Sequence, residues 1–242
     1  MRIRPVAKRQ FGVSTNLYRQ QRLGRSQLLE IGAHGFEAVE LVAAPGHLEP
    51  ENPAAVADLQ QWLAEARLDV SSVRGPTGTP PPPPEQLEAA LFLARRIRVP
   101  VFVMAVEGTR DKARRNVERV ATLAAPLGVT VAVEGPEHSP PGSAVHMVED
   151  ELETKVGIAL DFGRADRDGD LVEAIEVVAE HLVAVRLPVD GNIDWASVMT
   201  TVQKVGYEGP LVFDGQWRGS TKEYLARARV ARDMMERWLT ST

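Results

Sequence analysis

The chain has 242 residues, of which 44% are hydrophobic and 25% are charged, a composition typical of a globular protein with a large core in one or two domains. This composition excludes a collagen-like or disordered chain, and no apolar run reaches the ~18 residues that a membrane-spanning helix needs. Without cysteine, the chain cannot form a disulfide, a thiolate nucleophile or a zinc–thiolate site. The net charge of −5 argues against a general affinity for nucleic acid. No apolar segment follows the basic start of the chain, so we expect a cytoplasmic protein.

Short apolar runs alternate with helical patterns along the whole sequence. The runs predict strands at 11–15, 37–41, 69–73, 100–105, 129–134, 156–161, 182–187 and 210–214. Amphipathic stretches such as 52–67 and 109–127 have apolar residues at three- and four-residue spacing, which indicates helices between the strands. The strands begin about 26 to 32 residues apart, the length of one βα unit.

Eight βα units predict a (β/α)₈ TIM barrel that forms a single domain over 1–242. The alternative is a doubly wound open sheet, but the first predicted strand is followed by no GxGxxG or Walker pattern. We therefore expect no nucleotide cofactor. In a barrel, the chemistry lies at the carboxyl ends of the strands.

Polar residues gather where the predicted strands end. Three apolar strands end directly on a carboxylate, at Glu134, Asp161 and Asp214. A carboxylate in this position is costly to bury unless it faces a cation, a donor or a cavity, so their convergence indicates a site. The further candidates at this end of the barrel are Glu40, His47, Arg74, Glu107, His138, Arg164, Arg186, Asp190, Gln216 and Trp217.

Several segments carry a resemblance to a known family. They are IGAHGFEAVEL, VAVEG, GIALDFGRA and VRLPVDGNIDWASVMTTVQKVGYEGPLVFDG, the last being the most specific. The sequence over 11–238 resembles the xylose isomerase-like TIM barrel superfamily, which includes sugar phosphate isomerases and epimerases and the endonuclease IV family.

The resemblance implies a site with one divalent metal ion, Mn²⁺ or Mg²⁺. The epimerase branch holds this ion with Glu, Asp, His and Glu on strands five to eight, and by position Glu134, Asp161 and Asp214 would be metal ligands. Two of the family glutamates also move the substrate proton, which implies that Glu134 and Asp214 are the catalytic pair. The family histidines, however, fall on Arg74, Arg164 and Arg186.

These departures change the chemistry, because arginine stays protonated and cannot bind a metal ion. We expect Arg164 and Arg186 to replace the charge of the metal in a metal-poor site, and arginine also binds phosphate or carboxylate, which suits an anionic substrate. Two alternatives remain open: a salt-bridge lattice that binds nothing, or a Mg²⁺ or Mn²⁺ ion held by the three carboxylates and water.

The first functional hypothesis is a sugar or sugar-like isomerase or epimerase, acting by proton transfer next to a carbonyl. Arginines would stabilise the enediolate, and the remaining mouth residues would bind the substrate: Glu40, His47, Arg74, His138, Asp190, Gln216 and Trp217. One alternative is a non-catalytic barrel that binds a small polyol or an anionic ligand. The other is an endonuclease IV-like DNA repair enzyme, whose metal site needs more histidines than His47 and His138 supply.

The expected partner is a small-molecule substrate, with no nucleic acid and no membrane. No sequence feature decides whether the chain forms a homo-oligomer.

Overall fold

The computed structural model describes residues 9–78, 81–135, 140–152, 154–215 and 217–240. His138 and Gln216, two of the expected substrate contacts, lie outside these ranges. Eight parallel strands close into a barrel in the order β1 to β8, with β1 paired to both β2 and β8. The prediction of a (β/α)₈ barrel is therefore confirmed.

The strands occupy positions within one residue of the predicted ranges at either end. They are β1 (Phe11–Ser14), β2 (Ala38–Val42), β3 (Asp69–Arg74), β4 (Val101–Ala105), β5 (Thr130–Glu134), β6 (Gly157–Asp161), β7 (Leu182–Leu187) and β8 (Leu211–Phe213).

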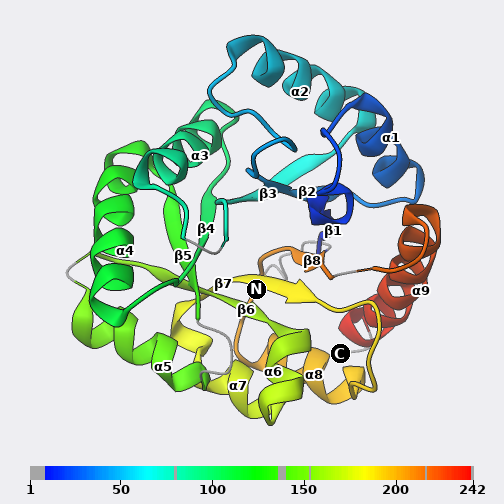
Figure 1. Ribbon diagram of the computed structural model, residues 1–242. Coiled ribbons are helices and arrows are strands. Elements are labelled where there is room, and N and C mark those ends of the chain that lie inside the picture. The colour runs from blue at the N-terminus through cyan, green and yellow to red at the C-terminus, as the bar shows by residue number, and fades with distance from the viewer. Residues whose placement is uncertain (1–8, 79–80, 136–139, 153, 216, 241–242) are drawn as a thin grey trace, which may run out of the picture.

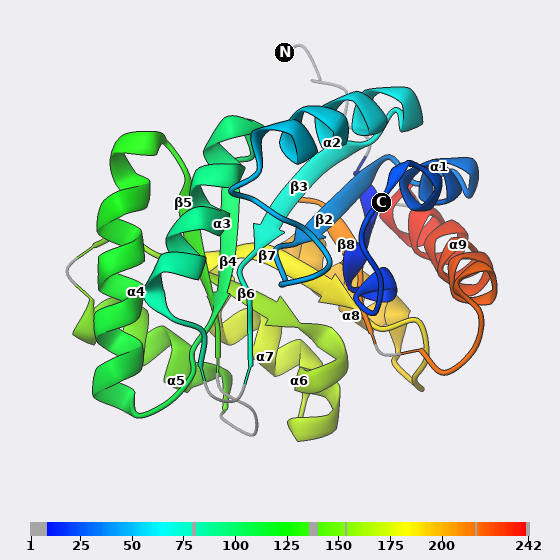
Figure 2. The ribbon, with the colours of Figure 1, turned by 45° about the horizontal axis from the view of Figure 1, so that its top comes forward.

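Helices surround the strands as a ring (Figure 1). They are α1 (Arg25–Ala33), α2 (Pro53–Ala66), α3 (Pro84–Arg96), α4 (Arg110–Ala124), α5 (Pro141–His146), α6 (Phe162–Asp168), α7 (Leu171–Val177), α8 (Trp195–Lys204) and α9 (Thr221–Thr240). Short helical turns cover Thr15–Tyr18, Ala125–Leu127, Met147–Glu151 and Ala179–His181. Helices α3 and α4 cover one flank of the barrel, and α1 and α9 cover the opposite flank (Figure 2). None of the helices within the described ranges is long and apolar enough to cross a membrane.

Local sequence signals fix where the helices begin. Asn52 accepts hydrogen bonds from the amides of Ala54 and Ala55, and Pro53 occupies the first turn of α2. Asp170 and Asp194 cap α7 and α8 in the same way. A carboxylate or amide oxygen at this position satisfies amides that have no partner inside the helix.

Alternation along the strands separates the helix-facing core from the barrel interior. On the interior face, the residues paired across neighbouring strands are small toward the amino ends of the strands and polar or charged toward the carboxyl ends. Gly12 pairs with Ala38 and Ala132 with Gly157, whereas two residues further along β1 and β2 Ser14 pairs with Glu40. Val103, Ala132 and Ala159 form a small cluster separate from the large core between the strands and the helices.

Two register shifts in the sheet keep the charged residues on the face that points into the barrel. One lies at Val39/Glu40 in the β2–β3 ladder, so that Glu40 pairs with Ser72. The other lies at Ile158/Ala159 in the β6–β7 ladder, so that Asp161 pairs with Arg186. An extra residue in one strand moves the following side chains to the other face, which here aims them into the barrel.

Replacing Gly12 by alanine should destabilise the barrel by about 1–3 kcal/mol, because a Cβ there would lie 2.8 Å from the backbone oxygen of Ala38 and the strands would have to move apart. Urea unfolding measures the loss. Gly142→Ala is the matched control, since a Cβ at Gly142 meets no atom within 4 Å. Equal stabilities of the two variants would contradict this account of the interior.

Candidate functional site

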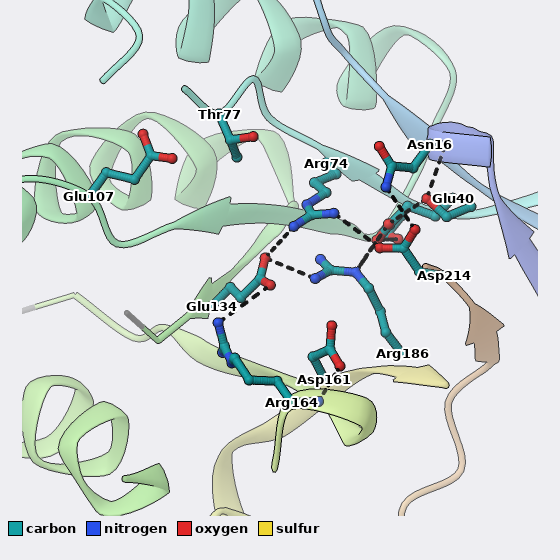
Figure 3. Close-up of polar contacts among 12 residues, drawn as sticks. Asn16, Glu40, Arg74, Thr77, Glu107, Glu134, Asp161, Arg164, Arg186 and Asp214 are labelled. Carbon is teal, nitrogen blue, oxygen red and sulfur yellow. Dashed lines mark hydrogen bonds and ion pairs between the residues drawn. The ribbon is translucent and has the colours of Figure 1, made fainter. Parts of the chain in front are cut away.

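Charged side chains from five strands, from helix α6 and from the loop after β8 meet at the carboxyl end of the barrel (Figure 3). They alternate in sign, so that guanidinium groups lie between carboxylates. The members of this mouth cluster are Glu40 on β2, Arg74 on β3, Glu134 on β5, Asp161 on β6, Arg164 on α6, Arg186 on β7 and Asp214 after β8. The structure thus brings together seven of the residues that the sequence singled out.

Arg186 is the most deeply buried cation of the cluster, with 2% of its side chain exposed. Its Nε donates to both oxygens of Glu40, at 3.1 and 3.3 Å. Its Nη1 lies 2.8 Å from Oε2 of Glu134. Burial alone would lower the pKa of Arg186, but the charges of Glu134 and Glu40, followed by those of Asp214 and Asp161, raise that pKa well above its ordinary value. Arg186 therefore stays charged.

Arg74 links the two carboxylates that were expected to be the catalytic pair. Its Nη2 donates to Glu134 at 2.9 Å, and its Nη1 donates to Asp214 at 3.1 Å. Arg164 lies further out, with Nη1 3.8 Å from Glu134. Arg74 and Arg164 keep 16% and 20% of their side chains exposed, so these two cations face the solvent side of the cluster.

Three polar residues that the sequence analysis did not single out complete the cluster. The hydroxyls of Ser14 and Ser72 donate to the two oxygens of Glu40, at 3.1 and 3.0 Å. The amide of Asn16 donates to Asp214 at 3.0 Å, and the backbone amide of Gly215 donates to the same oxygen. The alternation of side chains along the strands could have identified the two serines, because each pairs with Glu40 at a position that faces the barrel interior.

The charges around Glu134 decide its protonation. Burial by itself would raise the pKa of this carboxyl, but Arg186 and Arg74, with a smaller contribution from Arg164, lower the pKa to about 2. Glu134 is therefore a weak base at neutral pH. This disagrees with the expected use of Glu134 as a proton acceptor, since a general base works best with a pKa near the operating pH.

Asp161 has the opposite environment. It forms no ion pair among the described residues, and its Oδ1 accepts from the backbone amide of Arg164 as the cap of α6. Burial raises the pKa of Asp161, and the negative charges of Glu134 and Asp214 add to that rise, although the amide of Arg164 and the charge of Arg186 oppose it. Its raised pKa and its place outside the ion pairs suit Asp161 to take up a proton.

His47, Asp190 and Trp217 lie apart from this cluster. His47 is fully buried, and its ring nitrogens contact the backbone oxygen of Gln21 at 2.7 Å and the hydroxyl of Thr15 at 3.2 Å. Asp190 is exposed and pairs with Arg227. The Trp217 ring packs edge-on against Tyr224 and under Arg227. Both ring nitrogens of His47 thus contact protein groups in this structure, and its expected contact with substrate stays a prediction.

Comparison with known proteins decides the family. The family model described as xylose isomerase-like TIM barrel matches residues 28–242. The chain belongs to the xylose isomerase-like TIM barrel family. No curated protein matches the sequence significantly.

Solved structures with the same fold superpose on nearly the whole chain. A xylose isomerase-like TIM barrel protein from Mycobacterium smegmatis, in complex with magnesium, has a TM-score of 0.79 at 15% identity over 99% of both chains. D-psicose 3-epimerase from Clostridium cellulolyticum, with D-tagatose, has a TM-score of 0.73 at 15% identity over 95% of this chain and 99% of that one. A 3-keto-D-glucoside 4-epimerase from E. coli has a TM-score of 0.70 at 16% identity over 93% of this chain and 98% of that one. At these identities the similarity shows the fold.

The xylose isomerase-like barrel implies a divalent metal ion, and the mouth cluster does not fit one. The guanidinium groups of Arg74 and Arg186 lie between the carboxylates that would have to converge on the ion. Across the described ranges, no group of three histidine, cysteine, aspartate or glutamate side chains is arranged to hold a metal. The expected metal ligands Glu134, Asp161 and Asp214 are thus not arranged as a ligand set, because arginine cations lie among them.

Replacing Glu134 by glutamine should destabilise the protein by about 3 kcal/mol or more at pH 7, since it leaves buried arginine charges without their partner. The pKa of Glu134 falls from its ordinary 4.5 to about 2 on folding, so its carboxylate contributes stability above pH 4.5. That contribution is lost as the pH falls toward 2. The difference between the wild type and the variant should therefore shrink below pH 4.5.

Urea unfolding of both proteins at several pH values between 7 and 3 measures this difference. Glu176→Gln is the matched control, because Glu176 forms an exposed ion pair with Lys204. We expect that control to change stability by less than about 0.5 kcal/mol. A Glu134→Gln effect that is the same at pH 7 and pH 3 would contradict the assignment.

Proposed function

We propose that the chain is an isomerase of a small polyhydroxy carbonyl compound, a sugar or a sugar-like molecule, with Asp161 as the group that moves the proton. One observation carries the proposal: at the catalytic end of the barrel, Asp161 lies among arginine cations but outside the ion pairs that they form. The resemblance of the fold to sugar epimerases supports the same substrate class.

The proton balance of the reaction needs one base. The carboxylate of Asp161 takes the proton from the carbon next to the carbonyl, which gives an enediolate. The proton on Asp161 exchanges in part with solvent, and Asp161 then delivers a proton to the former carbonyl carbon while the hydroxyl proton moves to the other oxygen. Positive charge stabilises the negative oxygen of the enediolate, and the exposed Arg74 and Arg164 lie on the side from which a substrate arrives.

The ion pairs and hydrogen bonds of Glu134 and Asp214 favour isomerisation over epimerisation. Inverting a carbon centre uses an acid and a base on opposite faces, whereas moving a proton between neighbouring carbons on one face uses a single group. Glu134 is paired with arginines, and Asp214 accepts from Arg74 and Asn16. Asp161 is therefore assigned the proton transfer that was expected of Glu134 and Asp214.

A barrel that binds a polyol or an anionic ligand without converting it is the second candidate. It is favoured by the completeness of the ion pairs around Glu40, Glu134 and Asp214, which leaves one proton-moving group where an epimerase uses two. Binding of a compound in calorimetry without exchange of its protons would select this candidate.

The test is exchange of substrate protons with solvent. The protein should introduce deuterium next to the carbonyl of a matching aldose or ketose in D₂O, measured by proton NMR over a panel of neutral, carboxylated and phosphorylated sugars. Asp161→Asn should lower the exchange rate by about 10²- to 10⁴-fold, the usual contribution of a general base.

Asp58→Asn is the matched control, because Asp58 is an exposed aspartate on the outer helix α2, away from the barrel mouth. It should keep the wild-type rate. Full exchange in Asp161→Asn would overturn the role of Asp161, and a loss confined to Glu134→Gln in a folded protein would return the role of base to Glu134.

A further inference from the structure

The four carboxylates of the mouth cluster surround one buried cation. Glu40 and Glu134 contact the guanidinium of Arg186 directly, from β2 and β5. Asp161 pairs in register with Arg186 across the β6–β7 ladder, and Asp214, held by Arg74 and Asn16, lies beside Glu40 (Figure 3). The cation and its two direct partners are nearly excluded from solvent, with side-chain exposures of 2%, 2% and 8%.

This arrangement depends on charge compensation. Moving a guanidinium or a carboxylate out of water costs several kcal/mol, and only a well-placed opposite charge offsets that cost. Two further contacts fix Glu40 on Arg186, the hydroxyls of Ser14 and Ser72. The buried Nη2 of Arg186 has no hydrogen-bond partner among the described residues, so the guanidinium is held by charge more than by a complete set of hydrogen bonds.

We infer that Arg186 is a built-in cation that takes the place of a divalent metal ion at the barrel mouth, and that removing its charge turns the mouth into a metal site. The guanidinium lies between Glu40 and Glu134, where an ion bound to both would have to lie. Its positive charge also repels a second cation. The inference concerns metal binding alone and holds whether or not the proposed isomerisation occurs.

The donor chemistry of the cluster explains why a metal should bind once the guanidinium is gone. Four carboxylates without their central cation repel one another in a poorly solvated site, and they must either take up protons or bind a cation. Oxygen donors of this kind suit Mg²⁺ and Mn²⁺, which need no histidine or thiolate. Arg74 would remain beside Glu134 and Asp214, so the new site would form from Glu40, Glu134 and Asp161 once their side chains turn toward the space that the guanidinium leaves.

Calorimetric titration of the full chain with Mn²⁺ tests the inference. The wild type should show no stoichiometric binding. Arg186→Met, which removes the charge and keeps much of the side-chain volume, should bind one Mn²⁺ per chain with at least about a tenfold gain in affinity, equivalent to about 1.4 kcal/mol. Mn²⁺ should also raise the melting temperature of this variant and leave that of the wild type unchanged.

Three further variants locate the effect. Arg186→Lys keeps the charge and should bind no Mn²⁺. Arg164→Met removes a charge from the exposed edge of the cluster, 3.8 Å from Glu134, and should also bind none. Adding Asp161→Asn to Arg186→Met should weaken the new binding, because it replaces a charged carboxylate donor by a neutral amide.

The outcomes decide the inference in either direction. Stoichiometric Mn²⁺ binding by the wild type that Asp161→Asn abolishes would overturn it, as would a folded Arg186→Met variant that binds no Mn²⁺. If Arg186→Met does not fold, Arg186→His in neutral solution takes its place, with the same expected gain and the same overturning result. Failure of the isomerase proposal would leave all these titrations unchanged, so the two proposals fail separately.

Discussion

The guanidinium of Arg186 and the carboxylates around it form the interaction on which the barrel mouth depends. Arg186 reaches Glu40 on β2 and Glu134 on β5, so a single side chain links strands on different sides of the barrel. Ion pairs at the surface contribute little, whereas breaking a buried pair leaves an uncompensated charge at a cost of about 3–5 kcal/mol. The ion pairs of Arg186 thus both fix the geometry of the candidate site and offset the cost of burying its charges.

Small residues in the barrel interior support the charged layer at the carboxyl ends of the strands. Small residues on the interior face, among them Gly12, Ala132 and Ala159, place neighbouring strands close together beneath the charged layer. Apolar surroundings strengthen each ion pair and make any unpaired charge more costly. The interior therefore favours a layer of alternating charges in which each long side chain has one defined position.

The alternation of charges gives the four carboxylates of the mouth cluster different environments. Glu134 and Asp214 hold arginines, and Glu40 is fixed by Arg186 and two serines. Asp161 lies in the same layer but caps a helix and stays outside the ion pairs, which separates its proton affinity from that of Glu134. Carboxylates in one site acquire different uses because their neighbours differ.

The sequence by itself determined the fold and the charged residues that lie at the barrel mouth. Apolar runs at the spacing of βα units define the barrel, and a residue at the carboxyl end of a strand must lie at the mouth, which gave Glu134, Asp161 and Arg186. Only the tertiary structure decided the contacts: that Arg74 lies between Glu134 and Asp214, and that His47 is buried against Thr15. Strand position is a local property that periodicity records. The pairing of charges and the resulting pKa values depend on distances of a few ångströms between strands far apart in the chain, which no local pattern encodes.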